Sequence, residues 1–83
     1  MVSEEIVKKV LYFINSNRDG CIGRMIAADL GVSNDDVIGI LDELCDLNLI
    51  DICGDKPLDV NAKLNNIILI TEGYTDPRYS HIY

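Results

Sequence analysis

The stretch that decides the fold reads Ala27-Ala28-Asp29-Leu30-Gly31-Val32-Ser33. Gly31 interrupts an apolar helical pattern, and glycine adopts the left-handed conformation that ends a helix at little steric cost. Ser33 follows closely, and its hydroxyl can accept a hydrogen bond from a free backbone N–H at the start of a new helix. The stretch therefore predicts that one helix ends at Gly31 and another begins after Ser33, which is a tight helix-turn-helix.

Apolar residues at helical spacing flank this turn on both sides. Before the turn, Arg24–Leu30 predicts a short helix. The residues of this helix expected to face inward are Ile26, Ala27 and Leu30. After the turn, Ser33 opens a third helix, and Asp36 three residues later completes a capping-box pattern. The apolar stripe expected on this helix comprises Val37, Ile40, Leu41, Leu44 and Leu47. Asn48 can take the left-handed conformation that ends it.

A first helix and two strands complete the predicted order. Ser3 is expected to cap a helix that ends in the cluster of turn residues over Asn15–Gly20. Its apolar stripe comprises Ile6, Val7, Val10, Leu11 and Ile14. The segments Leu49–Cys53 and Asn66–Thr71 are rich in β-forming residues and predict two strands. The polar segment Gly54–Asn65 between them predicts a long hairpin with a loose loop at its tip.

Composition limits the chain to a single small domain. Its 83 residues include 48% hydrophobic and 25% charged residues, the balance of an ordinary globular protein. There is no run of eighteen apolar residues that would predict a membrane span, and the acidic start lacks a signal-peptide pattern. We therefore expect a cytoplasmic protein with a domain over residues 1–73 and a C-terminal tail over residues 74–83.

The residues that carry catalysis or metal binding do not form a recognisable set. The three cysteines include no close pair, and the single histidine, His81, lies in the tail. No nucleophile motif or glycine-rich phosphate loop is present, so we expect no enzyme activity, no cofactor and no metal. Asp42 and Asp46 lie four residues apart on one helical face, which suits either a solvated acidic surface or a hard cation.

Three helices followed by a two-stranded hairpin is the order of the winged helix-turn-helix family, an α+β fold. Residues 27–33 resemble the core of transcriptional regulators in that family, where Leu-Gly makes the turn and Ser caps the recognition helix. Leu47-Asn48-Leu49-Ile50 resembles the second half of the pattern, with Asn48 where the family often has glycine. Ile70-Thr71-Glu72-Gly73 is similar to the Leu-Thr-x-x-Gly stretch that closes the wing. The resemblance spans about residues 6–73.

The resemblance implies that the third helix enters the major groove of DNA. The residues it places at this interface are Ser33, Asn34, Asp35, Ile38, Gly39 and Asp42. Asn34 can read adenine, and the Ser33 hydroxyl can donate to a phosphate. Around this helix, Arg24, Lys56 and Lys63 are positioned either as a small phosphate clamp or as ordinary solubilising charge.

The distribution of charge opposes this reading. The chain carries a formal net charge of −7. No Lys or Arg occurs from Ser33 through Asp55. The acids in that stretch are Asp35, Asp36, Asp42, Glu43, Asp46, Asp51 and Asp55. A carboxylate about 10 Å from a phosphate is repelled by about 0.4 kcal/mol in water before salt screening.

Two hypotheses follow from these opposing observations. The first is a regulator-type winged helix that binds duplex DNA with weak or partner-dependent affinity. The alternative is an acidic winged helix that contacts a basic protein partner and does not bind DNA. Neither hypothesis involves a membrane. The tail is amphipathic, and it either packs back on the first helix or docks on a second copy, which would make a homodimer. Its apolar and aromatic residues are Tyr74, Tyr79, Ile82 and Tyr83.

Overall fold

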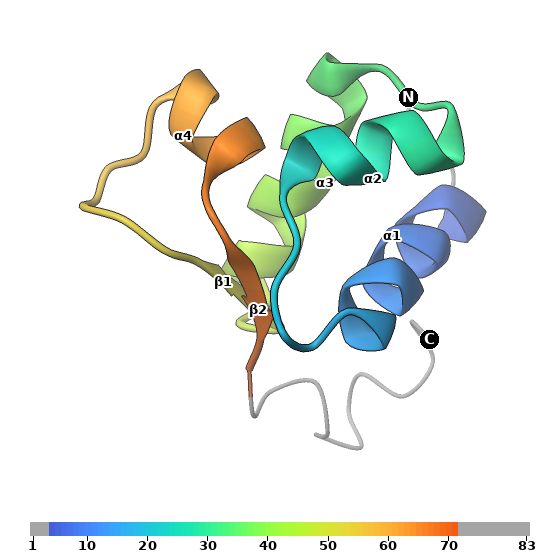
Figure 1. Cartoon of the computed structure of the whole chain (residues 1–83), viewed down its shortest axis with the longest axis horizontal. Coiled ribbons are helices and arrows are strands. Elements are labelled where there is room, and N and C mark those ends of the chain that lie inside the picture. Colours follow the sequence, from blue (N-terminus) through green and yellow to red (C-terminus); the bar gives the residue numbers. More distant parts are fainter. Residues whose placement is uncertain (1–3, 72–83) are drawn as a thin grey trace.

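The structure is a computed structural model that describes residues 4–71 of the chain (Figure 1). In this range the elements are α1 (Glu4–Ser16), α2 (Gly23–Leu30), α3 (Asn34–Asp46), β1 (Ile50–Ile52), α4 (Val60–Asn65) and β2 (Ile68–Ile70). The predicted α+β class is confirmed, and helices followed by an antiparallel hairpin are compatible with a winged helix. The expected cap Ser3, residues 72 and 73 of the wing motif, and the tail 74–83 lie outside the described residues.

The predicted helix-turn-helix junction is present between α2 and α3. Gly31 ends α2 in the left-handed conformation with φ 66°, and its N–H donates to the carbonyl of Ala27. The Ser33 hydroxyl caps α3 by accepting a hydrogen bond from the Asp36 N–H at 3.1 Å. Asn48, after α3, has the predicted positive φ of 61°. These local predictions are confirmed.

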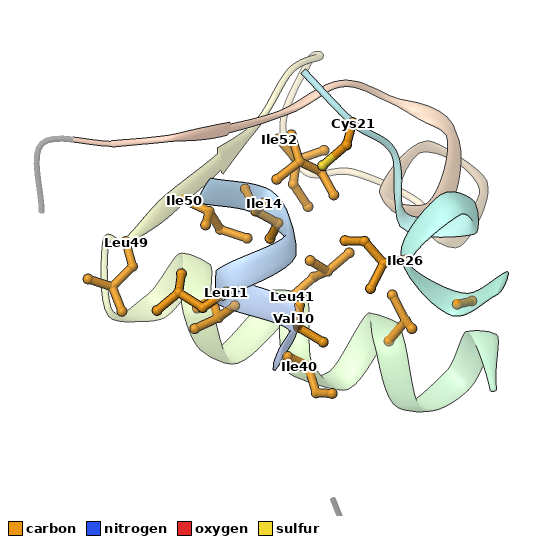
Figure 2. Close-up of a cluster of buried hydrophobic side chains, with 14 residues drawn as sticks. Val10, Leu11, Ile14, Cys21, Ile26, Ile40, Leu41, Leu49, Ile50 and Ile52 are labelled. Atoms are coloured by element: carbon orange, nitrogen blue, oxygen red, sulfur yellow. The ribbon is translucent and has the colours of Figure 1, made fainter. Parts of the chain in front are cut away.

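The core lies where α1, α2 and α3 meet the hairpin (Figure 2). Among the described residues, every buried residue is apolar. The helical part of the core comprises Val10, Leu11, Ile14, Ile26, Ala27, Val37, Ile40, Leu41 and Leu44. The remaining members of the cluster are Cys21, Leu49, Ile50, Ile52 and Ile68. The predicted stripe residues Ile6, Val7, Leu30 and Leu47 are partly buried against it. The apolar periodicity of the sequence therefore identified the core faces of all three helices.

The hairpin is shorter than predicted and has a third partner. β1 and β2 pair antiparallel with Ile50 opposite Ile70 and Ile52 opposite Ile68. On the other side of β2, the Ile68 N–H donates to the carbonyl of Cys21 at 2.7 Å. The segment between α1 and α2 is thereby joined to the last strand, a contact that the sequence analysis did not predict.

The prediction of a loose loop over Gly54–Asn65 was wrong, because its second half forms α4. The Asp59 carboxylate caps this helix by accepting from the Ala62 N–H at 2.7 Å. Leu64 is buried, and α4 packs against both α2 and α3. A Cβ atom at Gly23 would lie 3.0 Å from the carbonyl oxygen of Lys63, so only a glycine lets α4 approach the start of α2 this closely. Figure 1 shows α4 beside α3 at the end of the hairpin.

Candidate nucleic-acid interface

The predicted reading residues occupy the first part of α3 and its exposed side. Asn34 and Asp35 are exposed in the first turn. Ile38 and Asp42 follow at intervals of one helical turn and are half-buried. The Ser33 hydroxyl accepts the capping hydrogen bond, which leaves its own proton to donate to another group. The structure therefore brings these residues together on one helix, in the row that the sequence predicted.

Lys63 contacts the far end of this row. Its ammonium nitrogen lies 3.0 Å from Oδ1 and 3.2 Å from Oδ2 of Asp42. This ion pair is only partly exposed to solvent, with 24% of the Lys63 side chain accessible. The sequence left Lys63 either as part of a phosphate clamp or as ordinary solubilising charge. In the structure, Lys63 of α4 pairs with a carboxylate of α3, and this ion pair adds to the packing of α4 on α3.

Arg24 of α2 also contacts α4. Its Nε donates to Oδ1 of Asn65 at 2.6 Å. The Asn65 amide nitrogen in turn donates to the backbone carbonyl and the side-chain oxygen of Asn61, both at 2.8 Å. Arg24 and Lys63 are thus both tied to α4, one through an amide and one through a carboxylate. Asn61 and Asn65 were not among the predicted site residues, because their segment was expected to be a loop.

Lys56 lies in the connection that follows β1, before α4. Its ammonium group donates to the backbone carbonyl of Ile52 and lies 3.6 Å from Oδ1 of Asp51. Both side chains of this ion pair are more than half exposed, so the pair contributes little to stability. Each of the three candidate cations therefore has a partner within the chain.

Carboxylates dominate the electrostatics of α3. The acids on this helix are Asp35, Asp36, Asp42, Glu43 and Asp46, and the helix holds no Lys or Arg. Asp35 and Asp36 lie in the first turn, where the helix dipole favours negative charge. Glu43 and Asp46 lie towards the opposite end, where the dipole is unfavourable to carboxylates. A polyanion that approaches α3 therefore meets repulsion along the length of the helix.

The cysteines give no sign of a reactive or metal-binding centre in the described part of the chain. Burial raises the pKa of the Cys21 thiol. Burial, and secondarily the negative charge of Asp42, raises the pKa of Cys45. Cys53 is exposed. Within residues 4–71, no three His, Cys, Asp or Glu side chains are grouped so that they could hold a metal ion.

Comparisons with known proteins add no assignment to this geometry. Neither the models of known protein families, nor the curated proteins, nor the solved structures contain a match to this chain. Within the described residues, no helix is both long enough and apolar enough to cross a membrane. The function must therefore be argued from the helix-turn-helix and its charges.

Proposed function

We propose that this chain is a winged helix-turn-helix module of the transcription-regulator type that contacts duplex DNA with weak or partner-dependent affinity. One observation carries this proposal. The Gly31 turn and the Ser33 cap hold α3 so that its first turn, with Asn34 and Asp35, is exposed at the edge of the molecule. In helix-turn-helix proteins, the first turn of the motif's second helix, which corresponds to α3, reaches the base edges in the major groove.

The exposed side chains of α3 suit base edges better than phosphates. An Asn side chain can make paired hydrogen bonds with adenine, and an Asp carboxylate can accept from the amino group of cytosine. An apolar side chain such as that of Ile38 can contact the methyl group of thymine. In this proposal, Asn34, Asp35 and Ile38 supply sequence preference, and the Ser33 hydroxyl donates to a phosphate.

The cations around α3 explain why the proposed affinity is weak. Phosphate contacts supply most nonspecific affinity, because each one releases counterions from the DNA. Here Lys63 is paired with Asp42, and Arg24 is hydrogen-bonded to Asn65. Moving Lys63 to a phosphate would leave the Asp42 carboxylate without its cation and closer to the DNA. The net gain per phosphate contact is therefore smaller than for a cation that has no internal partner.

The test is binding of the full chain to mixed-sequence duplex DNA, measured by fluorescence anisotropy at low and then physiological salt. We expect micromolar dissociation constants at low salt and a steep loss of affinity as salt increases. Arg24→Ala should weaken binding and reduce the salt slope by about one. Arg18→Ala is the matched control, because it removes the same charge from the turn after α1, outside α3 and the wing. Equal effects of the two substitutions would contradict a phosphate contact by Arg24.

A second candidate function is contact with a basic protein, without DNA binding. The observation that favours it is the pairing of Lys63 and Arg24 within the chain, beside a helix that carries carboxylates and no cation. This candidate predicts no anisotropy change with DNA even at low salt, and no sequence enriched by selection from a random duplex pool. It also predicts binding to a labelled arginine-rich peptide, reduced by Asp35→Asn. Enrichment of a specific duplex that is lost on Asn34→Ala would exclude it.

A further inference from the structure

A surface groove of about 510 Å³ runs between α1 and the C-terminal end of α2. Its apolar lining comes from Tyr12 and Phe13 of α1 and Leu30 of α2. Phe13 and Leu30 pack against the core, whereas 68% of the surface of Tyr12 is exposed to solvent. We call this feature the α1–α2 groove. None of its lining residues belongs to α3, so it is a surface separate from the proposed DNA interface.

The exposure of Tyr12 sets this groove apart from the rest of the surface. A single exposed apolar residue is ordinary, but here an aromatic ring adjoins two further apolar side chains in a concave site. Tyrosine is among the residue types that contribute most to protein interfaces when their rings enter a pocket. The groove therefore combines a concave surface with an exposed aromatic side chain, as protein interfaces do.

The charges around the groove indicate which partner fits it. Two carboxylates, Glu5 and Asp29, and two ammonium groups, Lys8 and Lys9, line it together. Lys9 lies 3.9 Å from Glu5 in an exposed pair, which is weak enough for both groups to exchange partners. A strongly basic or strongly acidic partner would meet repulsion from one of these pairs. A second copy of the same surface, turned by a two-fold axis, can place the lysines of each chain against the carboxylates of the other. Charge complementarity thus favours self-association.

We propose that two copies of this chain associate about a two-fold axis through the α1–α2 groove, with Tyr12 of each copy seated in the groove of the other. The proposal is independent of what α3 binds. If α3 does bind DNA, the dimer presents two reading helices, as two-fold helix-turn-helix proteins do on paired half-sites. If α3 binds a protein, the same dimer presents two docking helices.

The first test is sedimentation velocity of the full chain over a concentration series. We expect a reversible monomer–dimer equilibrium that Tyr12→Ser weakens by about tenfold or more. Because Tyr12 is exposed, this substitution should leave the circular dichroism spectrum and the unfolding midpoint nearly unchanged. Val60→Ser is the matched control, since Val60 is 59% exposed on α4, outside the groove. Val60→Ser should leave the dissociation constant of the dimer unchanged.

The second test reverses the groove charges in two separate variants and then mixes them. The mixture can associate only if the two sets of charged residues face each other across the interface. One variant carries Lys8→Glu and Lys9→Glu, and the other carries Glu5→Lys and Asp29→Lys. Each variant alone should be monomeric, because like charges then face each other across the axis. An equimolar mixture should form a heterodimer, because both sets of contacts again join opposite charges.

Two results would overturn the proposal. A wild-type chain that stays monomeric up to about 100 μM would exclude a dimer of useful strength. A dimer that survives Tyr12→Ser and both charge reversals would show that the chains associate through a different surface. Neither result bears on the DNA measurement, so the two proposals fail separately.

Discussion

Gly31 and Gly39 are two exposed glycines of the helix-turn-helix with different backbone conformations. A Cβ atom would meet no other atom within 4 Å at either position, so space does not distinguish them. Gly31 has φ 66°, whereas Gly39 lies within α3. Any difference between the two alanine variants therefore reports backbone conformation alone.

We predict that Gly31→Ala destabilises the fold and that Gly39→Ala stabilises it. A left-handed conformation costs a residue with a Cβ about 1 kcal/mol, while alanine within a helix gains about 0.5–1 kcal/mol over glycine. Urea unfolding followed by circular dichroism measures both free energies of unfolding. If the two variants shifted the midpoint in the same direction, the assigned turn conformation at Gly31 would be wrong.

Cys21 should make the stability depend on pH in the alkaline range. Burial raises its pKa above the ordinary value of 9.0, so the folded chain holds this proton more tightly than the unfolded chain. The stability that this buried thiol contributes is fully present below pH 9. It is lost as pH rises through the pKa that Cys21 has in the folded chain. The slope from this one group can reach about 1.4 kcal/mol per pH unit.

The measurement is the unfolding free energy of the wild type and of Cys21→Ala at several pH values above 9. The unfolding free energy of the wild type should fall more per pH unit than that of Cys21→Ala. The variant should have the lower unfolding free energy at pH 9, because the substitution leaves a cavity. Cys53→Ser is the control, because this exposed thiol should leave the wild-type slope in place. Parallel slopes for wild type and Cys21→Ala would refute the buried-thiol explanation.

The residues that could be predicted from the sequence are those whose roles depend on near neighbours. Gly31, Ser33 and Asn48 each act within one helical turn, so their spacing alone was sufficient. Arg24 and Lys63 were identified as candidate cations, but their partners were not. Asn65 and Asp42 lie far from them along the chain, and only the packing of α4 brings each pair together.

At the scale of elements, α4 is the helix that apolar periodicity could not predict. Three helices of the described chain have apolar stripes that repeat over two or more turns, and these were predicted. α4 covers Val60–Asn65 and has a single buried side chain, Leu64. A helix this short is unstable alone and depends on tertiary packing. The cap at Asp59 was its one local sign.

We predict that Leu64→Ala destabilises the protein by about 2–4 kcal/mol, because it removes a side chain buried against α2 and α3. Val60→Ala is the matched control on the same helix, and it should change stability by less than about 0.5 kcal/mol. Chemical unfolding gives both values. A small effect of Leu64→Ala, equal to that of Val60→Ala, would mean that α4 does not pack in solution as described.

At the scale of the whole molecule, net charge should oppose folding. The chain has 14 acidic and 7 basic residues, and compaction brings the excess carboxylates together. Sodium chloride screens this repulsion over a Debye length that falls from about 30 Å at 0.01 M to about 3 Å at 1 M. We therefore predict that the unfolding midpoint rises with salt.

Thermal unfolding from low to high salt measures this effect. A variant with Glu43→Gln and Asp46→Asn removes two α3 carboxylates and should gain less from the same increase in salt. A midpoint that falls as salt is added would show that attractive ion pairs, such as Lys63 with Asp42, outweigh the general repulsion.

The hydrogen bond from Ile68 to Cys21 also affects the order in which the molecule can fold. Cys21 precedes α2 and Ile68 begins β2, so the contact closes a loop that contains α2, α3, β1 and α4. Helices built from local contacts form rapidly, whereas pairing of distant segments is slow. During synthesis the helices can form as they emerge, but the sheet cannot close until β2 has been made. Until then, the apolar faces that β2 will cover remain open to other nascent chains and to chaperones.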